Sequence, residues 1–251
     1  MKFEFKIVLC VLLLHTLAMS FANAQTKDDW ARKAALPKGE KRIALFNGKD
    51  LSGWEGRKEK YWSVENKVIK GANSEDVAAS SYLFTKKRYR EFRLLLEVKQ
   101  TRGDNFSTMH SAVCALGERI TDKGDEFSFK GPLLMFCNDW GIWDANRRNR
   151  IFPEKHDGTL LNPAEKIGDW NRIEILVVGN RIRMVSNGTL IIDFTDSPGM
   201  LSESQIGLQL HANNRPQEFR FRGLVLVENP KDRLVTLIKE KTEEKKEGES
   251  K

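Results

Sequence analysis

Residues 206–211, with the sequence IGLQLH, decide the fold of this chain. Successive side chains of an extended strand point to opposite faces, so the three aliphatic residues share one face, and Gly207, Gln209 and His211 share the other. The aliphatic face predicts contact with a hydrophobic core. The opposite face offers an amide and an imidazole, which are groups that bind ligands or transfer protons.

Two tight turns lie upstream of this strand. Gly179-Asn180 and Asn187-Gly188 separate runs in which apolar and polar residues alternate. Glycine and asparagine accept the positive φ that two-residue hairpin turns require. Downstream, residues 218–224 read EFRFRGL and alternate again. These patterns together predict an antiparallel β-sheet.

The same alternation predicts strands along most of the chain. No periodic pattern is visible between Cys137 and Asn171, and a loop of that length in a compact domain usually serves function. We expect one β-sandwich domain at 42–229, a flexible lead-in at 25–41, and a charged tail at 230–251 that begins with a short helix. The expected strands are residues 43–46, 62–65, 67–70, 81–84, 92–99, 110–115, 133–137, 171–178, 181–186, 189–194, 206–211 and 218–228.

Short motifs spread over the chain are similar to those of a known family. They are LFNGKDLSGW at 45–54, WSVE at 62–65, GDWN at 168–171, GNRI at 179–182 and QLH at 209–211. With these motifs in order, the chain resembles the bacterial 3-keto-disaccharide hydrolase domain family from about residue 43 to residue 228. The resemblance implies an all-β fold, a concanavalin A-like jelly-roll sandwich of two curved antiparallel sheets.

The resemblance also implies hydrolysis of a glycoside that carries a ketone at C3. The ketone acidifies the C2 proton, so a base can remove it while a donor or cation stabilises the enolate. The glycoside on C1 then leaves and water adds. In this chain His211 or Asp139 would be the base, and Arg147 or His110 would stabilise the enolate oxygen. The predicted catalytic residues are therefore His211, Asp139 and His110.

The chain departs from the family at two places. Family members often carry Glu-x-Gln on the strand that begins near residue 133, aimed at the concave face, and here the matching positions are Leu133 and Met135. His110 lies in MHSAV, where the family more usually shows a Gly-Asn-Ser-Gly-Ile type sequence. Either Asp139 or Asp144 supplies the missing carboxylate, or this chain has lost the family's chemistry.

The loop at 138–150 has a composition that suits a sugar. Aromatic rings stack on the C–H faces of sugars, while carboxylates, amides and guanidinium groups bind the hydroxyls. The competing interpretation is that the two tryptophans plug the end of the sandwich and the arginines are solvated. The predicted substrate-binding residues are Trp140, Trp143, Asp144, Arg147, Gln209 and Arg215.

A glycan-binding module without catalysis is the alternative function. Leu133 and Met135 favour it, since binding tolerates an apolar lining where proton transfer does not, whereas His211 and Gln209 on one face favour the enzyme. A scaffold protein that works through its tail ranks third. The basic and acidic residues at 239–251 balance one another and provide no strong field for a partner.

The first residues indicate export. Lys2 and Lys6 precede an apolar run at 7–14, and Ala22-Asn23-Ala24 has the small residues of a signal-peptidase site, so residues 1–24 are expected to be a signal peptide. The run is too short for a membrane span, and no membrane span is expected after cleavage. The protein would be periplasmic or extracellular. Its net charge of +7 comes from scattered basic residues, so nucleic acid is not an expected partner.

The cysteines and histidines predict no metal centre. Cys114 and Cys137 would lie on neighbouring strands, either bridged or as two buried thiols. Three histidines remain after the leader, namely His110, His156 and His211, and no Cys-x-x-Cys pair accompanies them. No cofactor is identified from the sequence, although a divalent metal would suit polarisation of the ketone.

Overall fold

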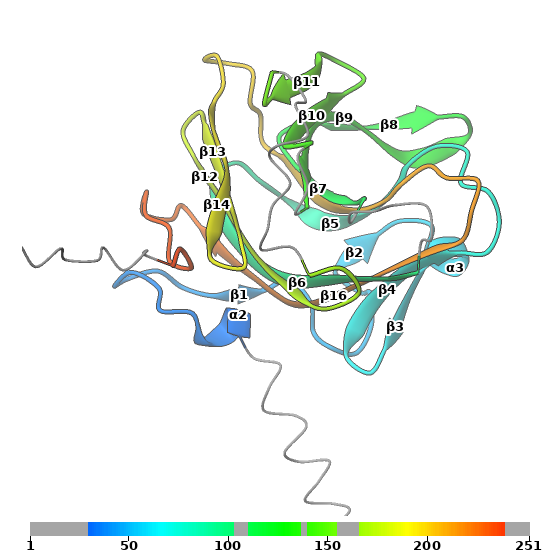
Figure 1. The fold of residues 1–251 in the computed structure, drawn as a ribbon, viewed down its shortest axis with the longest axis horizontal. Helices are drawn as coiled ribbons and strands as arrows, with labels where there is room; N and C mark the ends of the chain where they lie inside the picture. Colours follow the sequence, from blue (N-terminus) through cyan, green and yellow to red (C-terminus); the bar gives the residue numbers. More distant parts are fainter. Residues whose placement is uncertain (1–29, 103–109, 137–139, 155–165, 239–251) are drawn as a thin grey trace, which may run out of the picture.

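The computed structural model describes residues 30–102, 110–136, 140–154 and 166–238, which form two antiparallel sheets packed face to face (Figure 1). Sheet A has the order β14 (Thr189–Thr195), β13 (Arg181–Ser186), β12 (Asn171–Val178), β6 (Phe92–Arg102), β16 (Gln217–Glu228), β4 (Val68–Asn73) and β3 (Trp62–Glu65), with β1 (Ile43–Ala44) paired to β16. Sheet B has the order β11 (Asn149–Phe152), β10 (Ile142–Ala145), β9 (Asp125–Met135), β7 (Ala112–Cys114), β15 (Ser204–Leu210), β5 (Ser81–Tyr89) and β2 (Trp54–Glu55), with β8 (Glu118–Asp122) paired to β9. Two short helices, α2 (Trp30–Lys33) and α3 (Lys58–Tyr61), accompany the sheets. The predicted all-β sandwich is confirmed.

The main hydrophobic core lies between the two sheets. The aliphatic residues Ile206, Leu208 and Leu210 of β15 are buried in it, as the alternation of their strand predicts. Sheet A contributes side chains such as Leu94 of β6 and Ile173 of β12. Full burial of one such aliphatic side chain is worth about 1.5–3 kcal/mol. The opposite face of β15 is thereby turned away from sheet A.

The two predicted hairpins are present. The turns between β12 and β13 and between β13 and β14 place Gly179, Asn187 and Gly188 at φ values of 57°, 48° and 92°. The strands that follow do not continue the same sheet, however. β15 pairs with β5 and β7 in sheet B, whereas β16 returns to sheet A between β6 and β4. Alternation within a strand reports which face is buried and not which sheet the strand joins.

The region between Cys137 and Asn171 contains a hairpin that the sequence analysis missed. Strands β10 and β11 pair with each other, and β10 also pairs with β9. Each of these strands has four residues, too few for a clear periodic signal. Their strand conformation is set instead by a tertiary contact, namely their pairing to the edge of sheet B. The expectation of one long loop is therefore wrong for the described residues 140–154.

The chain ends of the described region lie on the outer face of sheet A, which is the face turned away from sheet B (Figure 1). The predicted helix after Pro230 is absent from residues 230–238. The Glu174 carboxylate instead accepts hydrogen bonds from the backbone N–H groups of Val235 and Thr236. This anchoring fixes an irregular backbone against the sheet. Residues 239–251 lie outside the described part of the chain.

A buried ion pair lies beneath these chain ends. Arg93 of β6 and Glu174 of β12 form an ion pair in which both side chains are 0% exposed. Glu40 accepts two further hydrogen bonds from the Arg93 guanidinium, each at 3.3 Å. The carbonyl oxygen of Lys231 accepts another at 3.3 Å. Segments from both ends of the described chain thus meet at one buried guanidinium.

In the parts of the chain that the structure describes, no helix has both the length and the apolar character needed to cross a membrane.

Candidate functional site

A pocket of about 500 Å³ opens on the face of sheet B that points away from sheet A. Its lining comes from the floor of the sheet, from the segment before β5, from the β8–β9 hairpin and from the region around β10. We refer to it as the sheet B pocket. Its lining residues are Ala78, Ala79, Ser80, Tyr82, His110, Asp122, Lys123, Ser128, Phe129, Leu133, Met135, Trp140, Trp143, Ala145, Asn146, Gln209, His211 and Ala212.

Beside the pocket, the central strands of sheet B carry small residues. Strand pairing aligns Trp143, Leu133, Cys114, Gly207 and Phe84 in one row across β10, β9, β7, β15 and β5. The outer members of this row are large and the central ones are small. A Cβ at position 207 would lie 2.5 Å from the Sγ atom of Cys114, closer than real contacts allow. Position 207 is therefore too crowded for a side chain larger than that of glycine.

The β8–β9 hairpin builds one wall of the pocket. Phe129 of β9 packs on Tyr82 and Phe84 of β5, with ring centroids 5.8 and 6.2 Å apart. The hairpin turn brings Lys123 to the rim, where its Nζ atom donates to the carbonyl oxygen of Ala78 at 3.3 Å. This wall is anchored by aromatic packing rather than by loop contacts alone, which makes it a rigid border for a ligand.

Two histidines meet at one end of the pocket. The pairing Cys114↔Gly207 and Val113↔Leu208 between β7 and β15, continued beyond the two strands, sets His110 opposite His211. Their ring centroids lie 4.1 Å apart with an angle of 70° between the rings. The backbone carbonyl of His211 accepts a hydrogen bond from the Nε2 atom of Gln217 at 2.6 Å. Neighbouring strands thus hold the two imidazoles in contact.

The pocket lowers the pKa of both histidines. Burial, and to a lesser extent repulsion from the charged form of the nearby His211, lowers the pKa of His110 from 6.5 to about 4. Burial also lowers the pKa of His211. Both imidazoles are consequently neutral at pH 7. A neutral imidazole can accept a proton at one nitrogen and donate a hydrogen bond from the other, but it supplies no positive charge.

Gln209 presents a hydrogen-bond acceptor that the described protein leaves unused. Its side chain is 1% exposed, and its Nε2 atom donates to the Tyr82 hydroxyl at 3.2 Å and to Ser80 Oγ at 3.5 Å. Among the described residues, none donates to its Oε1 atom. A buried acceptor without a partner costs about 1–3 kcal/mol. The atom is itself buried, so a ligand hydroxyl in the pocket would remove this cost only if the side chain shifted.

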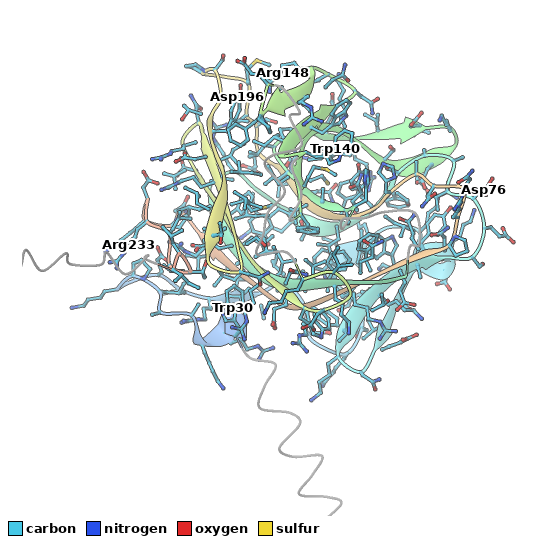
Figure 2. All side chains as sticks on the ribbon, viewed as in Figure 1. Trp30, Asp76, Trp140, Arg148, Asp196 and Arg233 are labelled. Carbon is cyan, nitrogen blue, oxygen red and sulfur yellow. The ribbon has the colours of Figure 1, made fainter. Side chains whose placement is uncertain are left out.

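The two tryptophans form a connected aromatic wall. Trp140 and Trp143 have ring centroids 6.0 Å apart, and Trp140 lies 5.8 Å from the His110 ring. The guanidinium carbon of Arg150 lies 4.7 Å from the centroid of the Trp140 ring. Figure 2 shows Trp140 on the side of the molecule where β9 and β10 lie, far from Trp30. Both predicted tryptophans therefore line the pocket together with the histidines.

Other predicted site residues lie elsewhere. Asp144 is fully buried and pairs with Arg147, whose Nε atom is 2.8 Å from Oδ1, and with Arg148. Arg148 also donates two hydrogen bonds of 2.7 Å to Asp196 in the segment after β14, and Figure 2 shows these two residues side by side. Neither Asp144 nor Arg147 lines the sheet B pocket. The ion pair between Arg148 and Asp196 ties the β10–β11 hairpin to the segment that follows β14 of sheet A.

Arg215 is exposed in the segment between β15 and β16 and does not line the pocket. Asp139, Cys137 and His156 lie outside the described residues, so their predicted roles stay predictions. Cys114 is a free, buried thiol. Burial raises its pKa well above 9, which keeps it protonated.

Some lining residues were missed in the sequence analysis. They are Ser80, Tyr82, Asp122, Lys123, Ser128, Phe129 and Asn146. A usable signal was present for the hairpin, because Asp122-Lys123-Gly124 is a turn sequence between two alternating runs. Tyr82 also alternates with the core residue Leu83. No local signal shows that the hairpin folds over the face of sheet B.

The described residues do not assemble a metal centre. Among them, no three or more His, Cys, Asp or Glu side chains lie close enough together to hold an ion. His110 and His211 are two ligands, and a protein metal site normally has three or four. Leu133 and Met135 both line the pocket, so the floor is apolar where the family often carries Glu and Gln.

Comparison with known proteins agrees with this architecture. Residues 41–226 match the profile of the 3-keto-alpha-glucoside-1,2-lyase-like domain family, which is most of the chain. A crystal structure from Parabacteroides distasonis, provisionally described as a glycosyl hydrolase, is 18% identical with a TM-score of 0.50, covering 74% of this chain and 93% of that one. The carbohydrate-binding module CBM66 of Bacillus subtilis is 14% identical with a TM-score of 0.45, covering 73% and 99%. No curated protein sequence matches the chain.

Proposed function

The chain belongs to the 3-keto-alpha-glucoside-1,2-lyase-like domain family, and from this premise we propose that its sheet B pocket cleaves 3-keto-glycosides by elimination followed by addition of water. The observation that carries the proposal is the contacting pair of neutral histidines, His110 and His211, beside the unused acceptor of Gln209. A neutral imidazole is the form that accepts a proton, so the pair supplies a base at neutral pH.

In the proposed reaction His211 removes the proton from C2 of the 3-keto sugar. The electron pair of the C–H bond forms the enolate of the C3 ketone, and the enolate then expels the glycosidic oxygen from C1. The leaving oxygen takes the proton from the His211 imidazolium. Water adds to C1 of the resulting enone and restores a proton at C2, so that net hydrolysis is complete.

The developing enolate needs stabilisation, and His110 is the candidate within the described pocket. Because its pKa is about 4, it is neutral under the conditions of the reaction and acts as an N–H donor rather than as a cation. Arg147, the alternative from the sequence analysis, pairs with the buried Asp144 outside the pocket. The proposal therefore assigns the stabilising hydrogen bond to His110.

Trp140, Trp143 and Gln209 hold the sugar in this proposal. The tryptophan wall suits the C–H faces of a pyranose ring, and the Gln209 Oε1 atom accepts a hydroxyl proton. Ordinary glycosidases use two carboxylates facing each other across the bond. Among the described lining residues Asp122 is the single carboxylate, so that mechanism finds no support here.

The test compares 3-keto-lactose with lactose as substrates of the purified protein, following the released monosaccharide by chromatography. We expect release from the keto sugar alone, and we expect His211→Ala to abolish it. Arg181→Ala is the matched control, because Arg181 lies on sheet A with an exposed side chain and away from the pocket. Release from lactose as well, or full activity of His211→Ala, would contradict the proposed mechanism.

A second candidate function is glycan binding without catalysis, and the apolar floor at Leu133 and Met135 favours it. In that case the same pocket would bind a sugar without turning it over. Isothermal titration calorimetry with 3-keto-lactose separates the two candidates. Saturable binding without release, weakened by Trp143→Ala, would assign the chain to this second function.

We also propose that the protein is exported and that its leader is removed after Ala24, on the strength of the residues at 1–24. Mass spectrometry of the protein recovered from the cell envelope and the medium would test this. A mature N-terminus at Gln25 is expected, and an intact N-terminus in the cytoplasmic fraction would contradict it.

A further inference from the structure

The outer face of sheet A carries a second hollow, of about 800 Å³, between α2, β12, β16 and the start of the C-terminal segment. Figure 2 places Trp30 on this side of the molecule and Trp140 on the side of the sheet B pocket. We call it the outer groove. The residues that carry the argument are Trp30, Glu97, Trp170, Arg172 and Arg222, all of which line it.

Strand pairing places a carboxylate between two arginines in this groove. Glu97 of β6 lies directly opposite Arg172 of β12 and, on its other side, opposite Arg222 of β16. The Glu97 side chain is 2% exposed and accepts hydrogen bonds from Arg222 Nε at 3.1 Å and Nη2 at 3.3 Å. The Nε atom of Arg172 lies 3.8 Å from Glu97 Oε1. Glu97 therefore fixes the position of the Arg222 guanidinium and attracts that of Arg172.

Each arginine is also held by a tryptophan ring. The guanidinium carbon of Arg222 lies 3.9 Å from the centroid of Trp170, and that of Arg172 lies 5.8 Å from the centroid of Trp30. Stacking of a planar guanidinium on an aromatic ring restricts its rotation and leaves its edge of N–H donors available. Arg222 is thus preorganised, which reduces the entropy lost when a ligand binds, whereas Arg172 makes longer contacts and is more exposed.

Arg172 has N–H donors that are available to a ligand. Its side chain is 53% exposed, and its guanidinium makes the Glu97 contact and the Trp30 stack with described residues, without a side-chain hydrogen bond among them. A guanidinium has five N–H donors in a fork that matches a carboxylate. Three basic side chains line the outer groove against two acidic ones. The groove is therefore suited to an anion that also has apolar surface.

We propose that the outer groove binds a carboxylate-bearing oligosaccharide, with one uronate carboxylate on the guanidinium of Arg172. The exposed edges of Trp30 and Trp170 would contact the C–H surfaces of the sugar rings. This site lies on the opposite sheet from the sheet B pocket and does not depend on the reaction proposed for that pocket. It would attach the protein to acidic glycans while the pocket acts on a neutral sugar.

Isothermal titration calorimetry with tetragalacturonate, and with maltotetraose as a neutral probe, tests the proposal on the full chain. Saturable binding of tetragalacturonate alone is expected. Arg172→Ala should weaken it about tenfold or more, the usual effect of losing charge-assisted hydrogen bonds, and Arg172→Lys should recover part of the affinity. Arg181→Ala is the matched control, since it removes the same charge from an exposed position on sheet A outside the groove.

The same experiment can overturn the proposal. Equal weakening by Arg172→Ala and Arg181→Ala would show a general charge effect rather than a site. Loss of binding in His211→Ala would place the ligand in the sheet B pocket. Equal affinity for maltotetraose, or no binding of tetragalacturonate to the wild-type protein, would remove acidic-glycan recognition altogether. Melting temperatures of the variants verify that Arg172→Ala remains folded.

Discussion

Replacing Glu174 by alanine should destabilise the fold far more than removing an exposed carboxylate. Glu174 and Arg93 are both 0% exposed, so the variant leaves a guanidinium charge inside the protein without its main partner. Glu40 remains, with two contacts of 3.3 Å, and offsets part of the loss. Breaking a buried pair from one side costs about 3–5 kcal/mol. That is a large share of the 5–15 kcal/mol by which a typical domain is stable.

Glu174 also anchors the C-terminal segment. Its carboxylate accepts hydrogen bonds from the N–H groups of Val235 and Thr236 and from the Thr236 hydroxyl, at 3.0, 2.8 and 2.7 Å. Glu174→Gln keeps an oxygen acceptor but loses the charge, so its destabilisation should lie between those of the wild type and Glu174→Ala. The triple variant Glu40→Gln/Arg93→Met/Glu174→Leu should recover part of the stability, because it removes the Glu40 carboxylate, 4% exposed and paired with Arg93, together with the other two charges.

The assay is urea unfolding followed by tryptophan fluorescence, with Asp193→Ala as the control. Asp193 accepts two hydrogen bonds from Arg181, at 2.7 and 2.6 Å, but the two side chains are 37% and 43% exposed. Exposed pairs contribute about 0.2–1 kcal/mol. If Glu174→Ala cost no more stability than Asp193→Ala, or if the triple variant were less stable than Glu174→Ala, the buried-charge argument would be refuted.

Three further predictions concern the sheet B pocket. The pKa of His110 is about 4 in the folded protein and 6.5 in the unfolded chain, so between these pH values only the unfolded chain gains this proton. The free energy of unfolding should therefore drop by up to about 3 kcal/mol between pH 6.5 and 4. Urea titrations at the two pH values should show a smaller drop for His110→Gln. Turnover of 3-keto-lactose should persist below pH 6.5, since burial lowers the pKa of His211 and keeps the base neutral there; a rate that halves near pH 6.5 or above would contradict this. Gly207→Ala should lower the free energy of unfolding by about 1–3 kcal/mol, because the new Cβ atom would collide with the Cys114 side chain. Adding Cys114→Ala should recover part of the melting temperature.

The features that could be predicted from the sequence are local ones. The alternation at 206–211 indicated correctly that Gln209 and His211 face away from the core, because the period of a strand is independent of its partners. The hairpin turns at Gly179-Asn180 and Asn187-Gly188 were equally predictable, since they depend on positive φ at a few positions. These features required no knowledge of the rest of the chain.

The features that escaped prediction depend on contacts between distant segments. The crossing from β15 in sheet B to β16 in sheet A has no local signature. Asp144 and Arg147 are residue types suited to a sugar site, yet they form an ion pair with each other outside the pocket. Contact between His110 and His211 requires the register of β7 on β15, and their lowered pKa requires the burial that follows from it.

The electrostatics of the sheet B pocket bear on the choice between catalysis and glycan binding. In the proposed reaction the enolate carries a full negative charge, which is opposed by the imidazolium of His211 and by the N–H dipole of neutral His110. A dipole stabilises charge well when water is excluded and the donor is already oriented. His110 and His211 meet the second condition because neighbouring strands hold them in contact. Leu133 and Met135 help to meet the first, because an apolar floor keeps the local dielectric constant low. Leu133 and Met135, which cannot transfer a proton, would then help neutral His110 to stabilise the enolate, and the keto-sugar assay measures whether turnover occurs.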